Sequence, residues 1–167
     1  TEQKKGKYDF SWIDAHVDGL IAEGIKPWVC LCYGNPIYSD HGLDLNAKLF
    51  PDGPIMDAWL RYVKACVKRY KGKVTMWEIW NEPDLHEDTS PSKPTWGGVK
   101  TEFFDFYEIA AKHLKKCFPN LKIGGPALAF RGDWAEDFLR EMKRRNVPID
   151  FFSWHIYTAD PESAGER

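Results

Sequence analysis

The chain has no concentrated charge of one sign and no long hydrophobic run. Over 167 residues, 23 Lys and Arg stand against 25 Asp and Glu, and the formal net charge is −2. Because a phosphate backbone is bound by a concentrated basic face, nucleic acid is a poor candidate partner. A transmembrane helix needs about 18 or more consecutive apolar residues. The sequence has no such run, so we expect no membrane partner, and the localisation stays open.

The sequence also lacks the motifs that indicate a cofactor. Its cysteines, at positions 30, 32, 66 and 117, form no CxxC pair, and we interpret them as free thiols. No GxGxxG follows a predicted strand, which argues against a bound dinucleotide. The HExxH spacing, which places two metal ligands on one helix, is also missing. We therefore predict neither a cofactor nor a metal.

Helical and strand patterns alternate along the chain. Apolar residues recur at helical spacing over 11–24, 54–70, 103–114 and 133–142. Short, mostly apolar runs follow these helices at 27–33, 74–80, 122–127 and 150–157, although the glycines weaken the pattern in the third run. The strands are too apolar to face water, so the pattern predicts parallel strands joined by helical crossovers.

Two α/β architectures fit this order: an open doubly wound sheet and part of a (β/α)₈ barrel. The polar loops after the strands, over 34–53 and 82–100, are long, as in barrel enzymes. We therefore predict a partial barrel that forms one domain over residues 1–167. A complete barrel needs about 250 residues, so we expect a fragment or a chain that needs a partner. Its open sheet edges predict self-association.

Polar residues follow two of the predicted strands. In WEIWNEPDL, residues 77–85, a buried strand ends in Asn81 and Glu82, and a buried carboxylate needs a partner. In the last strand, alternation puts Ser153, His155 and Tyr157 on one face, which would point into a barrel. A lone histidine in a strand is usually a hydrogen-bonded core residue. The presence of His155 and Tyr157 at the same rim as Asn81 and Glu82 instead predicts a functional site.

Several phrases together resemble a known enzyme group. YDFSWID, GIKPWV, WEIWNEPD, IGGPA and PIDFFSWHIY resemble the retaining glycoside hydrolases built on (β/α)₈ barrels. Among these, the chain is most similar to glycoside hydrolase family 39, the β-xylosidase and iduronidase-like group. The resemblance covers nearly the whole chain and places it at about the third to sixth strands of the barrel.

The resemblance implies a role for each polar residue. Glu82 is expected to be the general acid/base, and Asn81 to bind the 2-hydroxyl of the sugar. His155 and Tyr157 are expected beside the sugar-binding subsite. The substrate would be a carbohydrate, with a β-xyloside the commonest implication for the family. The family's nucleophile, a Glu on the seventh strand, is expected to be missing from this chain.

Retaining hydrolysis uses two carboxylates about 5–5.5 Å apart, one to attack the anomeric carbon and one to protonate the leaving oxygen. The remaining acids are poor substitutes for the missing nucleophile. Glu78 lies deeper in its strand, and we predict that it is paired inside the barrel. We predict that Asp84, His86 and Glu87 lie on a loop in contact with solvent.

Two other functions fit parts of the sequence. Glu82, Asp84, His86 and His155 could act together as oxygen and nitrogen ligands of a divalent metal in a barrel enzyme. Alternatively, a half barrel could bind carbohydrate without turnover, with Trp28, Tyr38 and Trp96 stacking on sugar rings. The missing nucleophile favours the second of these alternatives.

Overall fold

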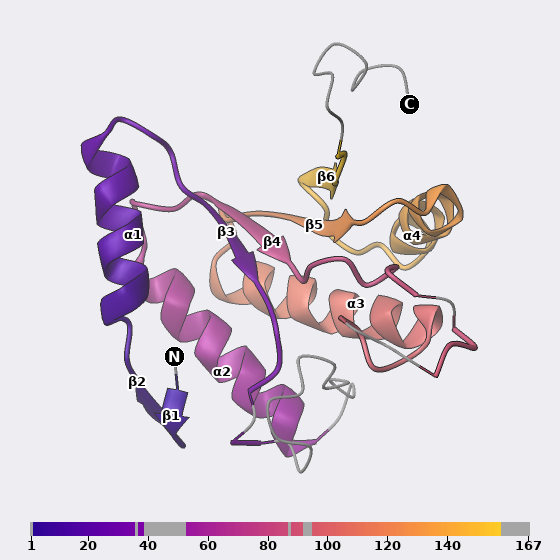
Figure 1. Ribbon diagram of the computed structural model, residues 1–167, viewed down its shortest axis with the longest axis horizontal. Coiled ribbons are helices and arrows are strands. Elements are labelled where there is room, and N and C mark those ends of the chain that lie inside the picture. Colours follow the sequence, from indigo (N-terminus) through magenta and orange to yellow (C-terminus); the bar gives the residue numbers. More distant parts are fainter. Residues whose placement is uncertain (1, 36, 39–52, 87, 92–94, 158–167) are drawn as a thin grey trace.

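The computed structural model describes residues 2–35, 37–38, 53–86, 88–91 and 95–157. These residues form a small N-terminal hairpin and four units of a helix followed by a strand (Figure 1). The elements in chain order are β1 (Glu2–Lys4), β2 (Lys7–Tyr8), α1 (Ser11–Ala22), β3 (Trp28–Leu31), α2 (Pro54–Arg69), β4 (Met76–Ile79), α3 (Lys100–Cys117), β5 (Lys122–Leu128), α4 (Gly132–Arg144) and β6 (Phe151–Trp154). None of the helices in these ranges is long and apolar enough to cross a membrane.

The main sheet has the strand order β3-β4-β5-β6, and each neighbouring pair is parallel. Neighbours in the sheet are therefore also neighbours in the chain, as in consecutive units of a (β/α)₈ barrel. The four predicted helices and four predicted strands are all present. Strand β5, for which the sequence pattern was weakest, has seven residues and is the longest described strand. The β1–β2 hairpin was not predicted, because its strands are very short and rich in Lys and Glu.

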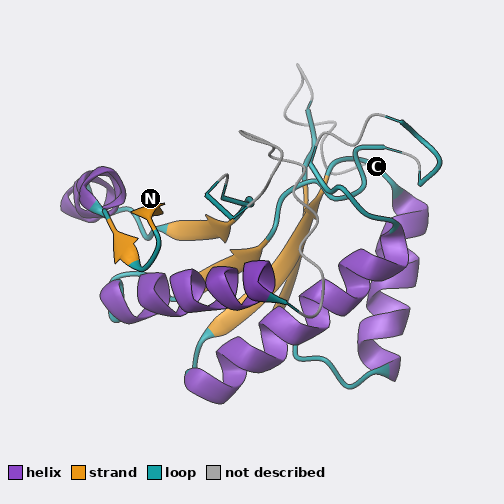
Figure 2. Cartoon of the chain, turned by 90° about the horizontal axis from the view of Figure 1, so that it is seen from below, coloured by secondary structure: helices purple, strands orange, loops and turns teal. Residues whose placement is uncertain are grey.

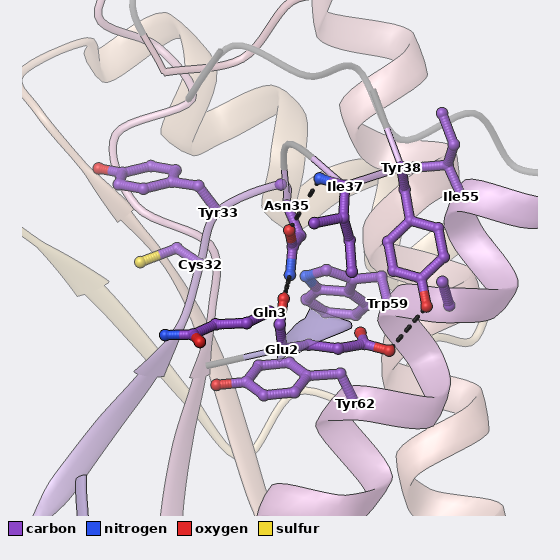
Figure 3. A pocket seen from close by; sticks show the side chains of 12 residues that line it. Glu2, Gln3, Cys32, Tyr33, Asn35, Ile37, Tyr38, Ile55, Trp59 and Tyr62 are labelled. Atoms are coloured by element: carbon purple, nitrogen blue, oxygen red, sulfur yellow. Dashed lines mark hydrogen bonds between the residues drawn. The ribbon is translucent and has the colours of Figure 1, made fainter. Parts of the chain in front are cut away.

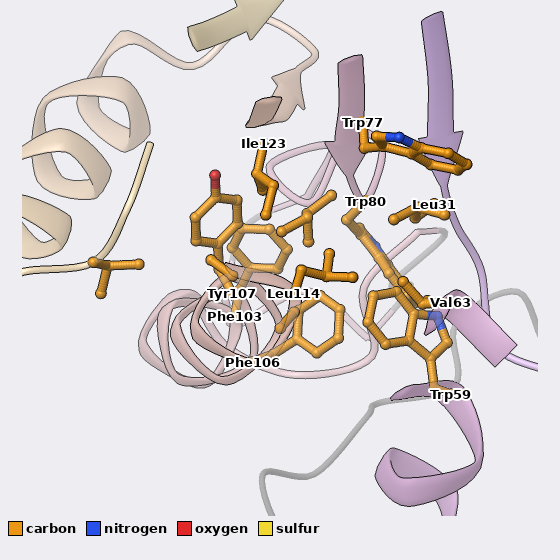
Figure 4. Close-up of a cluster of buried hydrophobic side chains, with 14 of the residues drawn as sticks. Leu31, Trp59, Val63, Trp77, Trp80, Phe103, Phe106, Tyr107, Leu114 and Ile123 are labelled. Carbon is orange, nitrogen blue, oxygen red and sulfur yellow. The ribbon is translucent and has the colours of Figure 1, made fainter. Parts of the chain in front are cut away.

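The core lies between the sheet and the helices α2 and α3, which run side by side along one face (Figures 1 and 2). Trp77 and Ile79 of β4 point into this layer and are fully buried. Aromatic rings of α2 and α3 complete this layer, and the ring centroids of Trp59 and Phe106 lie 5.0 Å apart (Figure 4). Burial of this apolar layer supplies the main stabilisation of the fold. It also leaves the other face of the strands for polar side chains.

Gly124 of β5 allows a close approach on that other face. A Cβ atom at this position would lie 2.3 Å from the Phe151 carbonyl oxygen and 2.4 Å from the Phe151 ring. Because glycine leaves this space open, the Phe151 ring can cross over β5 and meet Trp28 of β3 at 4.7 Å between ring centroids. The two outer strands of the sheet thus touch through their side chains.

Strands β3 and β6 are the outer strands of the described sheet, and each has one neighbouring strand there. Such edges can pair with another chain. We expect the 167-residue chain to self-associate through them, with a mass that rises with concentration in multi-angle light scattering. A monomeric mass at every concentration would contradict this prediction.

Asp150 fixes the start of β6 to the start of β5. Its Oδ2 accepts a hydrogen bond from the Ile123 amide at 2.8 Å and lies 2.7 Å from Lys115 Nζ. Partial burial acts to raise the pKa of this carboxyl, but Lys115 and the Ile123 amide outweigh it and lower the pKa below its usual value. The stabilisation is therefore present near neutral pH and is lost as the pH falls through the pKa of the folded state.

We expect Asp150→Asn to lower the free energy of unfolding by about 1–3 kcal/mol near neutral pH. The difference from the unsubstituted chain should be smaller at about pH 3, below the usual aspartate pKa of about 3.9, because the charge-dependent stabilisation is lost as the pH falls toward the lowered pKa of the folded state. Urea unfolding followed by circular dichroism at both pH values measures it. An equal loss at the two pH values would show that the charge of Asp150 contributes nothing.

Candidate active site

The backbone turns sharply where β4 ends. Trp80 and Glu82 both have positive φ angles, of 71° and 50°. The Trp80 indole is buried on the helix side of the sheet and donates from Nε1 to the Thr95 carbonyl oxygen at 2.9 Å. With Trp80 fixed there, the chain presents Asn81 and Glu82 beyond the carboxyl ends of the strands, where barrel enzymes place their active sites.

The backbone of Glu82 is held by two hydrogen bonds. Its amide donates to the Ala127 carbonyl oxygen at 2.9 Å, and the Thr95 hydroxyl donates to its carbonyl oxygen. A left-handed conformation costs a non-glycine residue about 1–2 kcal/mol, so these contacts stabilise a backbone shape that is unfavourable on its own. The side chain of Glu82 is 16% exposed. It can therefore reach a ligand and is still largely shielded from water.

His155, just beyond β6, is the partner of Glu82. Its Nδ1 lies 2.7 Å from Glu82 Oε1, so the imidazole and the carboxyl group are hydrogen-bonded. The His155 amide donates to the Leu128 carbonyl oxygen at 2.7 Å, which fixes the ring's position. Tyr157 lies further out, 84% exposed, with its ring centroid 6.3 Å from that of His155. The structure thus brings His155 to Glu82 and leaves Tyr157 at the outer edge of the site.

Asn81 is oriented by Tyr33, a residue that the sequence did not single out. Asn81 Nδ2 donates to Tyr33 Oη at 2.6 Å. Burial raises the pKa of the Tyr33 phenol, although the bond from Asn81 acts to lower it, so the hydroxyl keeps its proton near neutral pH. Tyr33 comes two residues after the end of β3, next to Cys32 in the chain. It could have been recognised as a polar side chain at the end of a third strand. The donation by Nδ2 leaves the amide oxygen of Asn81 as an acceptor for a ligand hydroxyl.

The ladder between β5 and β6 is irregular between Gly125 and Leu128. There the Ala127 amide donates to the Ser153 hydroxyl at 3.0 Å, in place of a main-chain partner. The Ser153 hydroxyl in turn donates to Glu78 Oε1 at 2.5 Å. The irregularity leaves the Ala127 carbonyl oxygen to accept from Glu82, so Ser153 and Glu78 support the backbone beneath Glu82. The prediction that Glu78 is paired inside the barrel is confirmed.

The prediction that Asp84 and His86 contact solvent is wrong. Asp84 has no exposed surface and His86 is 8% exposed. The Asp84 carboxylate turns back toward the end of β5 and accepts three backbone hydrogen bonds, from Ala129 at 2.7 Å, Phe130 at 3.1 Å and Arg131 at 2.9 Å. These bonds replace water around the charge and keep the carboxylate buried. Glu87 lies outside the described residues.

This burial also weakens the metal alternative. Both oxygens of Asp84 accept bonds from backbone amides of residues 129–131 and the carboxylate is fully buried, so it faces the end of β5 and not Glu82 and His155. Within the described part of the chain, no three or more His, Cys, Asp and Glu side chains are grouped as metal ligands. The four cysteines are free, as predicted.

Two cavities adjoin the site. A cleft of about 700 Å³ is lined by Glu82, His155 and Tyr157 together with residues of the turn between β5 and α4, among them Phe130. A second cavity of about 480 Å³ lies between β1, α2 and the segment after β3, and Tyr33 and Tyr38 line it (Figure 3).

The aromatic residues expected to stack on sugar are not gathered at one place. Trp96 is fully buried in the core, so it cannot stack on a ligand. Trp28 begins β3, at the opposite end of the sheet from Glu82. Tyr38 lines the second cavity and donates to Glu2 Oε1 at 2.7 Å (Figure 3). The three residues therefore do not form a common binding surface.

Comparison with known proteins agrees with this geometry. The model of the family described as glycosyl hydrolases family 39 matches residues 1–166. The chain belongs to glycosyl hydrolase family 39. This family 39 chain is 30% identical to a β-xylosidase of Geobacillus stearothermophilus over 94% of its own length. It is also 32% identical to the α-L-iduronidase of Mus musculus over 74% of its length. It spans about a third of the β-xylosidase, 32%.

Solved structures confirm the prediction of a partial barrel. A family 39 β-xylosidase from Caulobacter crescentus superimposes with a TM-score of 0.71 and 28% sequence identity, covering 92% of this chain and 35% of that one. The family 39 enzyme of Xanthomonas axonopodis gives a TM-score of 0.66 at 30% identity, covering 92% and 31%. The four units of this chain therefore correspond to one continuous part of a larger (β/α)₈ domain.

The Ser153 hydroxyl provides a test of the support beneath Glu82. Ser153→Ala leaves the Ala127 amide and Glu78 without this partner, and we expect a loss of about 1–3 kcal/mol in the free energy of unfolding. Urea unfolding measures it, with Ser11→Ala as control, since the exposed Ser11 hydroxyl bonds only to nearby Asp9. Equal losses in the two variants would contradict the assigned role.

Proposed function

We propose that the chain provides the acid/base side of a retaining glycoside hydrolase site that acts on β-xylosides. The Glu82–His155 pair carries this proposal, because it places a shielded carboxyl group and its proton partner in a cleft at the strand ends. The names of the relatives supply the substrate class, since two of them are β-xylosidases.

Each residue has a definite part in the proposed reaction. In the first step Glu82 donates its proton to the leaving oxygen as the glycosidic bond breaks and a second carboxylate bonds to the anomeric carbon. In the second step Glu82 takes a proton from the water that displaces this carboxylate. His155 orients the Glu82 carboxyl group through the 2.7 Å contact and Asn81 offers its amide oxygen to a sugar hydroxyl. Tyr157 lies at the outer edge, where it can contact the sugar.

The second carboxylate is proposed to come from outside the described residues. Glu78 accepts from the Ser153 hydroxyl, and Asp84 is enclosed by three amides. Neither carboxylate can attack a sugar without leaving these partners. Another part of the polypeptide or a second copy would therefore supply the nucleophile.

The test is the hydrolysis of a chromogenic aryl β-xyloside by two polypeptides. One is the 167-residue chain, and the other continues it with the following strand and helix units of the Geobacillus relative. We expect turnover only from the extended polypeptide, and a loss of about 10²-fold or more in kcat/KM with Glu82→Ala. Glu136→Gln, on the exposed surface of α4, serves as the control substitution.

Two outcomes would change the proposal. If the 167-residue chain itself turns over the xyloside and depends on Glu82, the nucleophile lies within it or in a second copy. If neither polypeptide hydrolyses the substrate, but both bind xylobiose with an affinity that Glu82→Gln leaves unchanged, the domain binds carbohydrate without turnover.

A further inference from the structure

One short segment of backbone, residues 127–131, binds both members of the proposed Glu82–His155 pair and also Asp84. The Ala127 carbonyl oxygen accepts from the Glu82 amide, and the Leu128 carbonyl oxygen accepts from the His155 amide. The next three amides, of residues 129–131, all donate to the Asp84 carboxylate. A change in the backbone shape of this segment would therefore shift Glu82 and His155 relative to each other.

Asp84 is the side chain that accepts bonds from all three of these amides, and the Arg131 side chain adds a salt bridge to Asp133 and a 3.4 Å bond to the His86 carbonyl oxygen. Asp84 binds where α4 is about to begin at Gly132, so its negative charge also lies at the positive end of the helix dipole. Consecutive amides that converge on one anion form a strong and directional site. The contact thus anchors the segment to the loop after β4.

The link from Asp84 to Glu82 is short and stiff. Pro83 alone separates them, and its ring fixes one backbone dihedral angle. Residues 82–84 are bound to the segment 127–131 at both ends, through the Glu82 amide and the Asp84 carboxylate. The left-handed backbone of Glu82 lies between these two attachments and is maintained by them.

We propose that Asp84 is the positioning residue of the acid/base: its buried carboxylate holds the segment 127–131 in the place where Ala127 and Leu128 align Glu82 with His155. Asp84 does not touch the substrate. The inference rests on the proposed function for its kinetic consequence, although the alignment itself can be measured without turnover.

A residue that only stabilises the fold would affect all substrates alike. A positioning residue of the acid/base affects substrates according to how much they need a proton. A dinitrophenyl leaving group departs as a stable anion, whereas an alkyl oxygen must be protonated as the bond breaks. The ratio of the two losses therefore separates positioning from general stability.

The substitution to test is Asp84→Asn, which keeps the shape but removes the charge and one acceptor. In the polypeptide that turns over β-xylosides, we expect kcat/KM for methyl β-xyloside to fall by about 10–100-fold. For dinitrophenyl β-xyloside, which bypasses the proton donor, we expect a loss of about threefold or less. Glu82→Gln should show the same selectivity in a stronger form.

Asp150→Asn is the matched control. Asp150 also accepts a backbone amide bond and links β5 to β6, but it does so at the opposite end of the sheet from Glu82. It should reduce stability without favouring one leaving group over the other. Equal losses on both substrates in Asp84→Asn, as in this control, would overturn the proposal.

A second measurement does not need activity. In the ¹⁵N-labelled 167-residue chain, the side-chain nitrogen signals of His155 report its bond to Glu82. We expect Asp84→Asn to shift the Nδ1 signal and to speed amide exchange at residues 129–131, while Asp150→Asn leaves both unchanged. An unchanged His155 signal in Asp84→Asn would refute the positioning role. If neither polypeptide hydrolyses any xyloside, the proposed function fails, and this measurement still decides the role of Asp84.

Discussion

The hydrogen bond from the Glu82 amide to the Ala127 carbonyl oxygen is the contact on which the site depends. A regular ladder would use that carbonyl oxygen within the sheet. The irregular stretch of β5 makes this oxygen available to the neighbouring loop. The Ser153 hydroxyl accepts the hydrogen bond of the Ala127 amide in place of a main-chain oxygen. The geometry of the candidate site is thus produced by a local departure from regular structure.

The hydrophobic pattern was sufficient to predict the fold. Buried parallel strands and amphipathic helices have periods that can be read directly from the chain, and their alternation limits the possible architectures. The rim could also be predicted, because Glu82 follows one predicted strand, His155 lies on the inward face near the end of another, and the ends of parallel strands must meet. Even the poorly patterned strand at residues 122–127 is present. Its Gly124 allows the close approach of Phe151, and its Gly125 lies close to the Ile79 backbone.

The details of the rim could not be predicted in this way. Asp84 looks like a loop residue in the sequence, and its partners lie 45 to 47 positions further along the chain. Trp96 has the flat ring expected of a residue that stacks on sugar, but its ring lies in the core, with its centroid 5.4 Å from that of Trp80. Tyr33 was missed because it was counted as the last residue of the predicted strand at 27–33. Long-range hydrogen bonds and the direction of a loop side chain depend on tertiary packing, which no local period records.

The contact between Trp28 and Phe151 has a consequence for how a barrel closes. In a flat sheet, strands separated by three spacings would lie about 14 Å apart. Their rings instead meet at a centroid distance of 4.7 Å across β4 and β5. The two side chains therefore lean toward each other across the same face of the sheet, an arrangement that the curved sheet of a barrel favours. In this part of a barrel, the side chains of the two outer strands already meet on the inner face. Further strands would continue the same curved sheet.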